Sequence, residues 1–448
     1  MGRRTGVIVL LGVVCLLAVL WSKMGGPSWY GIAVMSLFLA KIVLSWRPRP
    51  FEPLRAAAWR AVGESDPAAV ARIRVGAAVA VYNEDPAILA ACLESLLAQV
   101  RPIDSIVVID DCSADETSFH RASAMRERFE ARGIEFTALR FGHNRGKRHV
   151  LMRALDLQPD ADVLLGVDSD TMVDKYALAR LVQAYARPNV TAVTGLVLAL
   201  NYKRNLLTRL IDLRYAQSFL VDRSAQSRLG SMLCACGSLA LYSAPVLRKY
   251  QRDFLEQRFM GRPAVFGDDR RLTNYCLMEG RAIMEETAVA YTAVPERLGH
   301  FLRQQIRWNK SFFRESWWVL RTMPLAKPAL WFTFVELWSW VVFSFTLMYA
   351  VALAPLFTAR LLLGPYLVYV MLMAYGRAFR YPDITAVRPL AADRWIGFII
   401  APLYGFLHIG ILVWLRFYAL LTLRGNAWGT RQRVEVTITP GPALAPAI

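Results

Sequence analysis

Five apolar segments constrain what this chain can fold into more than any other feature of its sequence. They cover residues 6–21, 29–46, 331–357, 361–375 and 395–421. A helix needs roughly 20 apolar residues to cross a membrane, and the first two segments are long enough with tilt or snorkelling of their ends. The first has the length of a signal peptide, but no A-x-A-like cleavage site follows it. We therefore predict an N-terminal transmembrane hairpin over residues 1–50 and a C-terminal transmembrane and channel region over residues 329–423.

Basic residues beside these segments predict their orientation, since the cytoplasmic ends of membrane helices carry an excess of Lys and Arg. Arginines precede the first segment and follow the second, fourth and fifth, whereas the connections within the paired segments carry few cations. Both ends of the chain are therefore expected in the cytoplasm, and an odd number of crossings would contradict these flanks. Residues 395–421, interrupted by Pro402, Gly405 and Gly410, should form a bent hairpin, a re-entrant segment or an interfacial helix.

The charge of the chain limits its partners. Its 448 residues are 55% hydrophobic and carry a formal net charge of +18, which fits an anionic membrane surface or an anionic substrate or product. The basic residues do not form the long runs typical of nucleic-acid binding, so no nucleic-acid partner is expected. Six scattered cysteines fit neither a disulfide framework nor a C-x-x-C metal site, which indicates a reducing, cytoplasmic setting for the soluble part.

The section between the apolar segments has the alternating pattern of an α/β domain. An apolar run, a helical pattern and a second apolar run follow one another at residues 75–81, 87–99 and 105–110. Strand, helix and strand in this order predict a parallel, right-handed βαβ unit. Residues 161–171 again form a strand that ends in carboxylates. Because ligands of open parallel sheets bind beyond the carboxyl ends of the strands, these acidic strand ends predict the site.

Two pairs of acidic residues carry the candidate chemistry. Asp168 and Asp170 follow a predicted strand, and alternate residues of an extended chain point the same way, so both can hold one divalent cation. Such a cation would neutralise a diphosphate. Asp268 and Asp269 precede a helix in the stretch "VFGDDRRLTNY". Helix capping or a solvated turn is the alternative explanation of each pair.

The order of short motifs along the chain points to a known family. The chain contains "VYNED", "VIDDCS", "NRGKR", "VDSDT", "GDDR" and "QQIRW" in this order. The series resembles the processive inverting family-2 glycosyltransferases, and "NLLTRLIDLRY", "QQIRWNKSFFRES", "APLYGFLHIGIL" and "WGTR" are similar to class I hyaluronan synthases of the streptococcal type. The resemblance covers nearly the whole chain. It implies a cytoplasmic GT-A domain, Rossmann-like with a mostly parallel sheet, over residues 51–300 and inserted between transmembrane helices.

The segment that follows, residues 301–328, mixes aromatic and cationic residues at helical spacing. Such a pattern suits amphipathic helices at the membrane interface, with Trp and Phe towards lipid and Arg and Lys towards headgroups. Trp317 and Trp318 are candidates for membrane anchors, whereas Trp308 belongs to the Q-x-x-R-W motif.

The resemblance implies a role for each motif. Asp269 matches the base of an inverting transfer, Asp268 the acidic residue before it, and Asp168 and Asp170 the ligands of Mg²⁺ or Mn²⁺. The UDP part of the donor would contact Tyr82, Asp110, Asp111, Lys147, Arg307, Trp428 and Arg431, with Arg148 also near the diphosphate. The acceptor sugar would contact Cys236, Gly237, Ser238, Gln304 and Trp308, with the Trp308 ring as a stacking platform.

One departure from the family pattern concerns the acceptor site. Ser238 stands where these synthases usually have proline, and Ser243 stands where a basic residue is usual. By analogy both residues would line the acceptor site. The departure therefore leaves the sugar pair open.

Together these features predict a membrane-embedded, UDP-sugar-dependent β-glycosyltransferase that joins N-acetylglucosamine and glucuronate from UDP-GlcNAc and UDP-GlcA. The nascent polysaccharide would leave through the enzyme's own channel, in contact with membrane lipid. We expect a multi-pass cell-membrane protein with a cytoplasmic catalytic domain, and a cytoplasmic WGTR segment with a disordered tail over residues 424–448. A chitin-oligosaccharide synthase or a glucose/glucuronate capsule synthase is the alternative. A transporter without chemistry would not need these motifs together.

Overall fold

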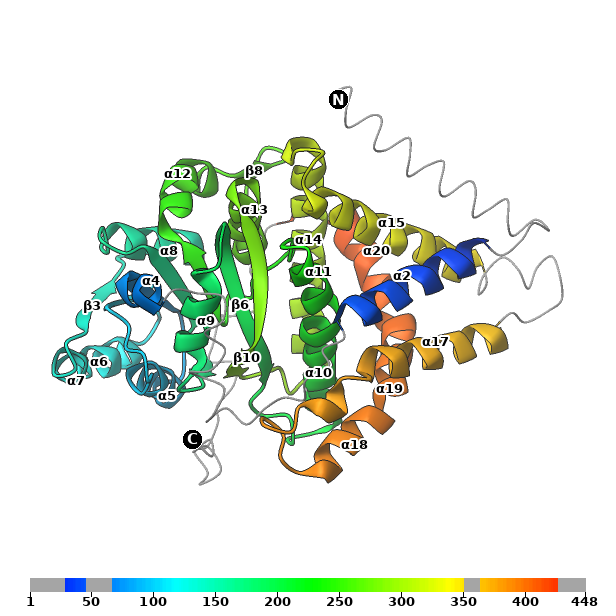
Figure 1. The fold of residues 1–448 in the computed structure, drawn as a ribbon, viewed down its shortest axis with the longest axis horizontal. Coiled ribbons are helices and arrows are strands. Elements are labelled where there is room, and N and C mark those ends of the chain that lie inside the picture. Colours follow the sequence, from blue (N-terminus) through cyan, green and yellow to red (C-terminus); the bar gives the residue numbers. More distant parts are fainter. Residues whose placement is uncertain (1–28, 46–66, 350–362, 426–448) are drawn as a thin grey trace.

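The computed structural model describes three stretches of the chain, residues 29–45, 67–349 and 363–425. Their elements form an α/β domain around a sheet and a group of long helices on one side of that domain (Figure 1). The predicted first apolar segment, residues 6–21, lies outside the described residues, as do Trp428 and Arg431.

An eight-stranded sheet forms the centre of the α/β domain, with its strands in the order β3-β2-β1-β4-β7-β6-β10-β5. β1 to β4 are parallel to one another, and so are β6 and β10, whereas β7 and β5 are antiparallel to their neighbours. The predicted, mostly parallel sheet is therefore confirmed. The strands are β1 (Val75–Val81), β2 (Ser105–Asp110), β3 (Glu135–Arg140), β4 (Val163–Asp168), β5 (Thr171–Val173), β6 (Val190–Ala199), β7 (Ala240–Ser243) and β10 (Arg281–Thr292).

The parallel half of the sheet contains the predicted βαβ unit. β1 and β2 are nearly continuous apolar runs with almost every residue buried, as expected of strands covered on both faces. The helix between them, α5 (Pro86–Leu97), begins after Asp85, whose carboxylate accepts hydrogen bonds from two backbone N–H groups of the first turn. Val81 pairs with Asp110 across the two strands, so their carboxyl ends meet at one edge of the sheet.

The remaining elements of the α/β domain pack on this sheet or beside it, and α8, α9, α10 and α13 all contact its strands. A two-stranded hairpin, β8 (Arg258–Phe259) and β9 (Arg262–Pro263), lies outside the main sheet. The helices are α4 (Pro67–Arg72), α6 (Thr117–Ser123), α7 (Arg126–Glu130), α8 (Lys147–Asp156), α9 (Ala177–Tyr185), α10 (Leu206–Gln217), the π-helix η2 (Ser218–Arg223), α11 (Ser224–Arg228), α12 (Ala244–Leu255) and α13 (Asp268–Glu279).

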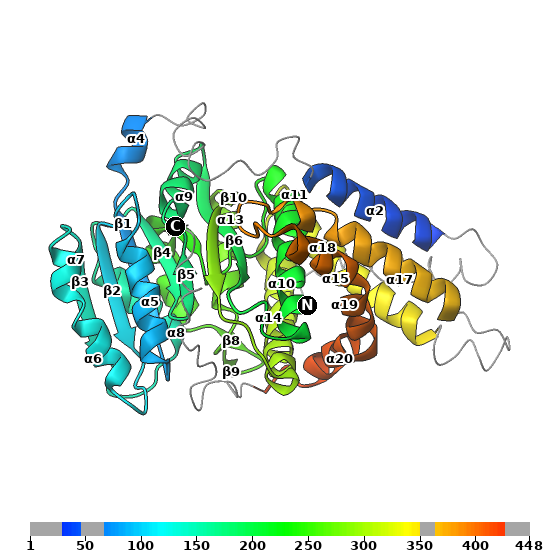
Figure 2. The same ribbon diagram turned by 90° about the horizontal axis from the view of Figure 1, so that it is seen from below.

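Three apolar helices, α2 (Trp29–Ser45), α15 (Pro328–Met348) and α17 (Leu363–Ala378), extend away from the α/β domain (Figure 2). By length and composition α15 is able to cross a membrane. Asp222 of η2 connects the other two helices to the α/β domain, because its carboxylate lies 3.0 Å from the Lys41 ammonium and 3.0 Å from the Arg377 guanidinium. A short 3₁₀ turn, η4 (Tyr381–Asp383), follows α17.

The last apolar segment consists of α18 (Ala391–Ile399), α19 (Ala401–Leu407), the π-helix η5 (His408–Leu412) and α20 (Val413–Leu421). Together these pieces are long and apolar enough to cross a membrane, yet residues at or just beyond both ends of the segment pair with residues outside it. Asp393 pairs with Lys203 at 2.7 Å, and Lys310 donates a hydrogen bond to the carbonyl of Gly425 at 3.2 Å.

This segment also lies against α10 of the α/β domain and against the long helix α14 (Leu298–Thr322), since α19 contacts α10 and α20 contacts α14. α19, η5 and α20 follow one another without a break, so the hairpin alternative for residues 395–421 is wrong. The re-entrant segment and the interfacial helix stay predictions.

The segment predicted as interface helices contains one long helix, α14 (Leu298–Thr322). The expected membrane anchor Trp318 instead packs edge-on against Tyr275, with ring centroids 5.7 Å apart, and under the Arg271 guanidinium at 4.4 Å. Arg314 is also buried, although cations were expected at headgroups. These two expectations are wrong because this part of α14 packs against α13 and forms protein core.

Candidate active site

A cavity of about 700 Å³ opens at the carboxyl ends of β1 and β4. The starts of α8 and α13 border it, and α10, η2 and α14 form its other wall. Most of the predicted site residues line it, although they come from distant parts of the chain: Tyr82, Asp111, Lys147, Asp168, Asp170, Cys236, Ser238, Asp268, Asp269, Gln304, Arg307 and Trp308.

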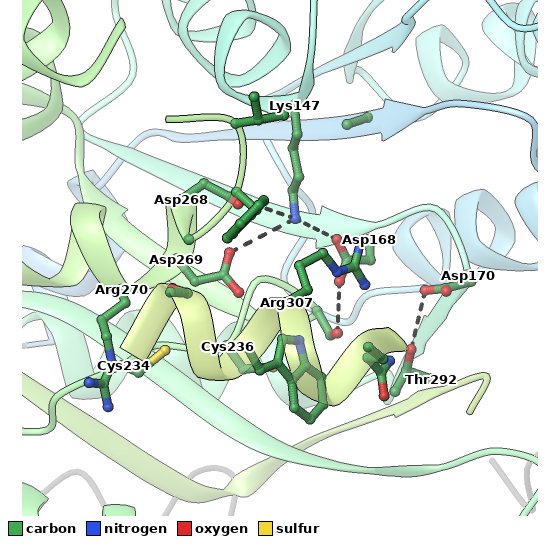
Figure 3. Close-up of a pocket in the computed structure, with 18 of the residues that line it drawn as sticks. Lys147, Asp168, Asp170, Cys234, Cys236, Asp268, Asp269, Arg270, Thr292 and Arg307 are labelled. Carbon is green, nitrogen blue, oxygen red and sulfur yellow. Dashed lines mark hydrogen bonds and ion pairs between the residues drawn. The ribbon is translucent and has the colours of Figure 1, made fainter. Parts of the chain in front are cut away.

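Three carboxylates converge on the Lys147 ammonium group in this cavity (Figure 3). The Lys147 Nζ atom lies 2.6 Å from Asp168 Oδ1, 3.5 Å from Asp268 Oδ2 and 3.9 Å from Asp269 Oδ1. Lys147 begins α8, and the two adjacent aspartates form the first residues of α13, so two helix N-termini meet here. The predicted metal-binding and base motifs therefore share one counter-ion.

The crowding of these charges changes their proton affinities. Burial by itself would lower the pKa of Lys147, but Asp168, Asp268 and Asp269 outweigh it and raise that pKa well above its ordinary value. Burial and the charge of Asp268 raise the pKa of Asp269 to about 8. Burial also opposes ionisation of Asp268, but Lys147 and a hydrogen bond with Asp269 keep its pKa below the ordinary value. Asp269 is therefore the member of the pair that can take up a proton near neutral pH.

Asp168 and Asp170 supply two carboxylates to the cavity. Asp168 Oδ2 accepts a hydrogen bond from the Ser238 hydroxyl at 2.9 Å, and Asp170 Oδ1 accepts one from the Thr292 hydroxyl at 3.2 Å. Within the described part of the chain, no group of three or more His, Cys, Asp and Glu side chains is placed to hold a metal ion. Two hard oxygen ligands fit Mg²⁺ or Mn²⁺ when substrate phosphates complete the coordination. The Lys147 ammonium shows that a cation is accommodated beside Asp168.

The loop that contains Gly237 comes within contact distance of the base candidate. The Gly237 N–H donates a hydrogen bond to Asp269 Oδ2 at 3.0 Å. A Cβ atom on Gly237 would lie 2.5 Å from Asp269 Oδ1 and 2.9 Å from Lys147 Nζ. Only glycine lets the backbone approach so closely. Cys236 lines the cavity beside it, and its backbone N–H donates to the Thr194 hydroxyl at 3.1 Å.

Ser243, the second departure from the family pattern, does not line the cavity. It ends β7 and pairs with Val163 at the start of β4, whereas the cavity opens at the other end of β4. The expectation that Ser243 lines the acceptor site is therefore wrong, because β7 runs antiparallel to β4 and carries this residue away from the site.

Asp111 organises the loop before Lys147. Its carboxylate accepts hydrogen bonds from the backbone N–H groups of Arg145 at 2.7 Å and Gly146 at 2.8 Å. Burial outweighs these hydrogen bonds and raises the pKa of Asp111. Because Asp111 also lines the cavity, it connects the cavity wall at the end of β2 to the loop that positions Lys147.

Asp110 and Arg148 lie outside the lining of the cavity. Asp110 is only 1% exposed and pairs with the Arg140 guanidinium at 3.1 Å, so its predicted contact with the nucleoside stays a prediction. Arg148 is buried and donates a hydrogen bond to the carbonyl of Phe254 at 3.0 Å. The expectation that Arg148 faces the diphosphate is wrong, since successive residues of a helix point about 100° apart around its axis.

α14 places three predicted residues on one helical face, at the spacing i, i+3 and i+4. The side chain of Trp308 is 44% exposed, and its ring centroid lies 6.2 Å from that of Tyr215. The Oε1 atom of Gln304 is buried and has no hydrogen-bond partner among the described residues. An exposed ring beside an unsatisfied acceptor atom is suited to a sugar, which offers both an apolar face and hydroxyl donors.

Sequence reasoning missed the part of the wall that α10 and η2 contribute. The missed lining residues include Arg214, Tyr215, Ser218 and Arg223. The Arg223 Nε atom donates a hydrogen bond to the carbonyl of Cys234 at 2.9 Å, and its guanidinium lies 4.2 Å over the Phe219 ring. The stretch "NLLTRLIDLRY" was available as a signal, but it marks the family without indicating which side chains face the site. The π-helical geometry of η2 also changes which residues share a face.

Comparison of the sequence with known proteins identifies the family to which this site belongs. A sequence model described as "Glycosyltransferase like family 2" matches residues 72–311. The chain is also 33% identical over 445 residues to the hyaluronan synthase of Streptococcus pyogenes serotype M3, covering 96% of this chain and 98% of that protein. This chain belongs to the family-2 glycosyltransferases of the hyaluronan synthase type.

Two further proteins are similar to this chain, one in sequence and one in structure. The chain is 34% identical over 369 residues to an N-acetylglucosaminyltransferase of Azorhizobium caulinodans, covering 80% of this chain and 87% of that protein. Its structure is similar to that of a mannosyltransferase from Pyrobaculum calidifontis in complex with GDP-mannose and Mn²⁺. The TM-score is 0.50 at 22% identity, covering 85% of this chain and 97% of that chain. The predicted GT-A fold and family resemblance are confirmed.

Proposed function

We propose that this family-2 glycosyltransferase is a processive, inverting enzyme that builds hyaluronan from UDP-GlcNAc and UDP-GlcA and exports the polymer through the membrane. The observation that carries the proposal is the position of Asp269, which faces the same cavity as Asp168 and Trp308. A base, a leaving-group site and an acceptor platform thus border one space. The similarity to a streptococcal hyaluronan synthase over 96% of the chain supports the choice of product.

Asp269 would act as the general base. An inverting transfer needs a base that removes the proton from the acceptor hydroxyl as its oxygen attacks the anomeric carbon opposite the departing nucleotide. The Gly237 N–H holds Oδ2 of Asp269, so that Oδ1 is oriented to accept this proton. Because burial and Asp268 raise the pKa of Asp269 to about 8, its carboxyl group can keep the proton after transfer.

Lys147, Arg307, Asp168 and Asp170 would surround the diphosphate of the donor. A divalent cation held by the two aspartates, Mg²⁺ or Mn²⁺, would stabilise the negative charge of the departing UDP. Lys147 would move its ion pairs from the carboxylates to the phosphates when the donor binds, since both partners are anionic. The proposed nucleoside contacts are Tyr82, Asp110 and Asp111, together with Trp428 and Arg431 beyond the described residues.

The acceptor sugar would lie on the Trp308 ring, with the Gln304 carbonyl oxygen accepting a hydrogen bond from one of its hydroxyl groups. The Oε1 atom of Gln304, which has no partner in the described part of the chain, supports this placement, because a buried polar atom without a partner is costly and a bound hydroxyl would satisfy it. Cys236 and Ser238 border the same cavity near the base.

Export would begin where the cavity wall meets the membrane helices. Arg214 lines the cavity and lies 3.8 Å from Asp222, which also pairs with Lys41 of α2 and Arg377 of α17. Three cations around one carboxylate leave a net positive charge, which would attract a polymer that carries glucuronate. We propose that the catalytic domain faces the cytoplasm and that α2, α15 and α17 cross the cell membrane.

A synthase that uses N-acetylglucosamine alone is the second candidate. The similarity to the Azorhizobium caulinodans N-acetylglucosaminyltransferase favours it, although that match covers 80% of the chain. Ser238, which differs from the usual residue of the hyaluronan synthases, lies at the carboxylate end of the cavity.

The two candidates are separated by supplying the purified full chain, in nanodiscs with Mg²⁺ or Mn²⁺, with each UDP-sugar singly and then with both. We expect a long polymer only when both donors are present, and complete digestion by a hyaluronan-specific lyase. A lyase-resistant product from UDP-GlcNAc alone would instead establish the N-acetylglucosamine polymer, and a requirement for UDP-glucose would indicate a capsule synthase.

A further inference from the structure

The hydroxyl group of Ser238 contacts a carboxylate of the D-x-D pair. Its Oγ atom donates a hydrogen bond to Asp168 Oδ2 at 2.9 Å, and Ser238 is only 6% exposed. Its neighbour Gly237 holds Asp269. Two successive residues of one loop therefore contact the predicted metal ligand and the predicted base.

The two oxygens of Asp168 have different surroundings. Oδ2 accepts the Ser238 hydrogen bond, whereas Oδ1 lies 2.6 Å from the Lys147 ammonium. A carboxylate that is held at one oxygen has a defined orientation about its terminal torsion, which is otherwise broad. Ser238 thereby leaves Oδ1 facing the Lys147 ammonium, which would move to the phosphates when the donor binds and leave this oxygen to the divalent cation.

This contact belongs to a residue at which the chain departs from its family pattern. Proline has no hydroxyl group and no backbone N–H, so a chain with proline at this position lacks the hydrogen bond that Ser238 makes. Hydrogen bonds to the ligands of a metal orient those ligands and affect how tightly the metal binds.

We infer that Ser238 is a positioning residue that orients Asp168 for the divalent cation. The inference rests on the proposed metal role of Asp168. It gives the departure at this position a physical consequence, since serine in place of proline adds a hydrogen bond to the proposed metal ligand.

The test measures Mn²⁺ binding directly, by electron paramagnetic resonance of the purified full chain in nanodiscs with UDP present. No sugar donor is supplied, so the result does not depend on transfer. We expect Ser238→Ala to weaken Mn²⁺ binding about tenfold, in line with the loss of a partner of a metal ligand. Ser238→Thr should bind Mn²⁺ within about twofold of the unaltered protein, because its hydroxyl can still donate the hydrogen bond to the metal ligand.

Ser243→Ala is the matched control, because Ser243 is also a buried serine of this region but lies at the far end of β7. It should leave Mn²⁺ binding unchanged. If Ser238→Ala is poorly folded by its thermal unfolding midpoint, Ser238→Cys replaces it, because the thiol has nearly the same shape and is only a weak donor.

Equal Mn²⁺ binding by the unaltered protein and Ser238→Ala would overturn the inference, and so would a loss in Ser238→Thr as large as that in Ser238→Ala. A raised KM for an oligosaccharide acceptor, with Mn²⁺ binding intact, would assign Ser238 to the acceptor site instead. If the unaltered protein binds no Mn²⁺ with UDP, the proposed metal role of Asp168 itself fails, which is a separate result.

Discussion

The two walls of the cavity differ in how their side chains are held. On the strand-end wall, hydrogen bonds fix each carboxylate: the Gly146 N–H and Arg145 N–H hold Asp111, and the Gly237 N–H holds Asp269. On the helical wall, the Trp308 ring is half exposed, and the Oε1 atom of Gln304 has no hydrogen-bond partner among the residues that the structure describes. One wall is therefore rigid and the other is still able to form contacts.

This difference corresponds to the two tasks of a processive enzyme. Proton transfer and departure of the nucleotide need groups fixed to within a fraction of an ångström, which backbone hydrogen bonds supply. A growing polymer must advance after every addition, and a flat ring holds a sugar without the directional constraint of many hydrogen bonds. The comparison predicts that changes on the strand-end wall affect chemistry and changes on the helical wall affect elongation.

The largest effect is expected from removal of the base on the rigid wall. Asp269→Asn should lower the rate of sugar transfer by about 10² to 10⁴, the usual contribution of a general base. UDP binding should remain, because the amide has the same shape. Transfer kinetics and calorimetric UDP binding test both parts. Asp160→Asn is the control, since that carboxylate is 73% exposed and lies before the start of β4, at the opposite end of the strand from the cavity. Transfer within tenfold of normal would exclude Asp269 as the base.

A slightly smaller effect is expected from displacing the base without removing it. Gly237→Ala inserts a Cβ atom 2.5 Å from Asp269 Oδ1, so the carboxylate has to move. A catalytic group misplaced by about 1 Å can lower the rate about 10²-fold. Gly142→Ala is the matched control, because no atom lies within 4 Å of its added Cβ. If both variants transfer sugar at the same rate, the strand-end wall is not as rigid as its contacts indicate.

On the helical wall, Trp308→Ala should separate elongation from donor use. Loss of the stacking ring should slow elongation about tenfold, since aromatic contacts contribute about 0.5–1.5 kcal/mol beyond burial. Hydrolysis of the donor by water should be nearly unchanged. Trp317→Ala is the control on the same helix, because that ring is also exposed (38%) but does not line the cavity. Equal losses of elongation and hydrolysis would indicate that Trp308 supports the fold.

The smallest effect is a shift in pH dependence. The base must be deprotonated to act, so kcat/KM should rise with pH through about 8, the raised pKa of Asp269. Asp268→Asn removes a negative charge that raises this pKa, so the rise should move to lower pH. A pH–rate profile of each protein measures the shift. An identical profile in both would show that Asp268 does not influence the base.

Much of the rigid wall could be predicted from the sequence, because its residues follow short, local patterns. Apolar strands that end in carboxylates predicted β1, β2 and β4, and the carboxyl ends of parallel strands necessarily meet at one edge. Asp168, Asp170 and Asp269 were predicted from motifs of a few residues. Arg148 was placed wrongly, because a neighbour in sequence is rotated away from Lys147 on a helix.

The helical wall and the membrane side depended on tertiary packing. Arg214 and Arg223 line the cavity because α10 and the π-helix η2 form one wall of it together with α14. Helical periodicity in the sequence does not indicate which face of a helix meets its neighbour. Trp318 has the composition of a membrane anchor but packs on Tyr275.

The sequence by itself determined the fold class, the family and the residue types of the catalytic centre, since these follow from local patterns and from motifs kept in order along the chain. Only the tertiary structure decided that Lys147 is the counter-ion of three carboxylates, that Ser238 holds Asp168, and that the last apolar segment runs along α10 and α14. The physical reason is that charge pairing and side-chain packing act between residues far apart in the sequence, more than 100 positions in the case of Lys147 and Asp269. Their geometry exists only once the chain has folded.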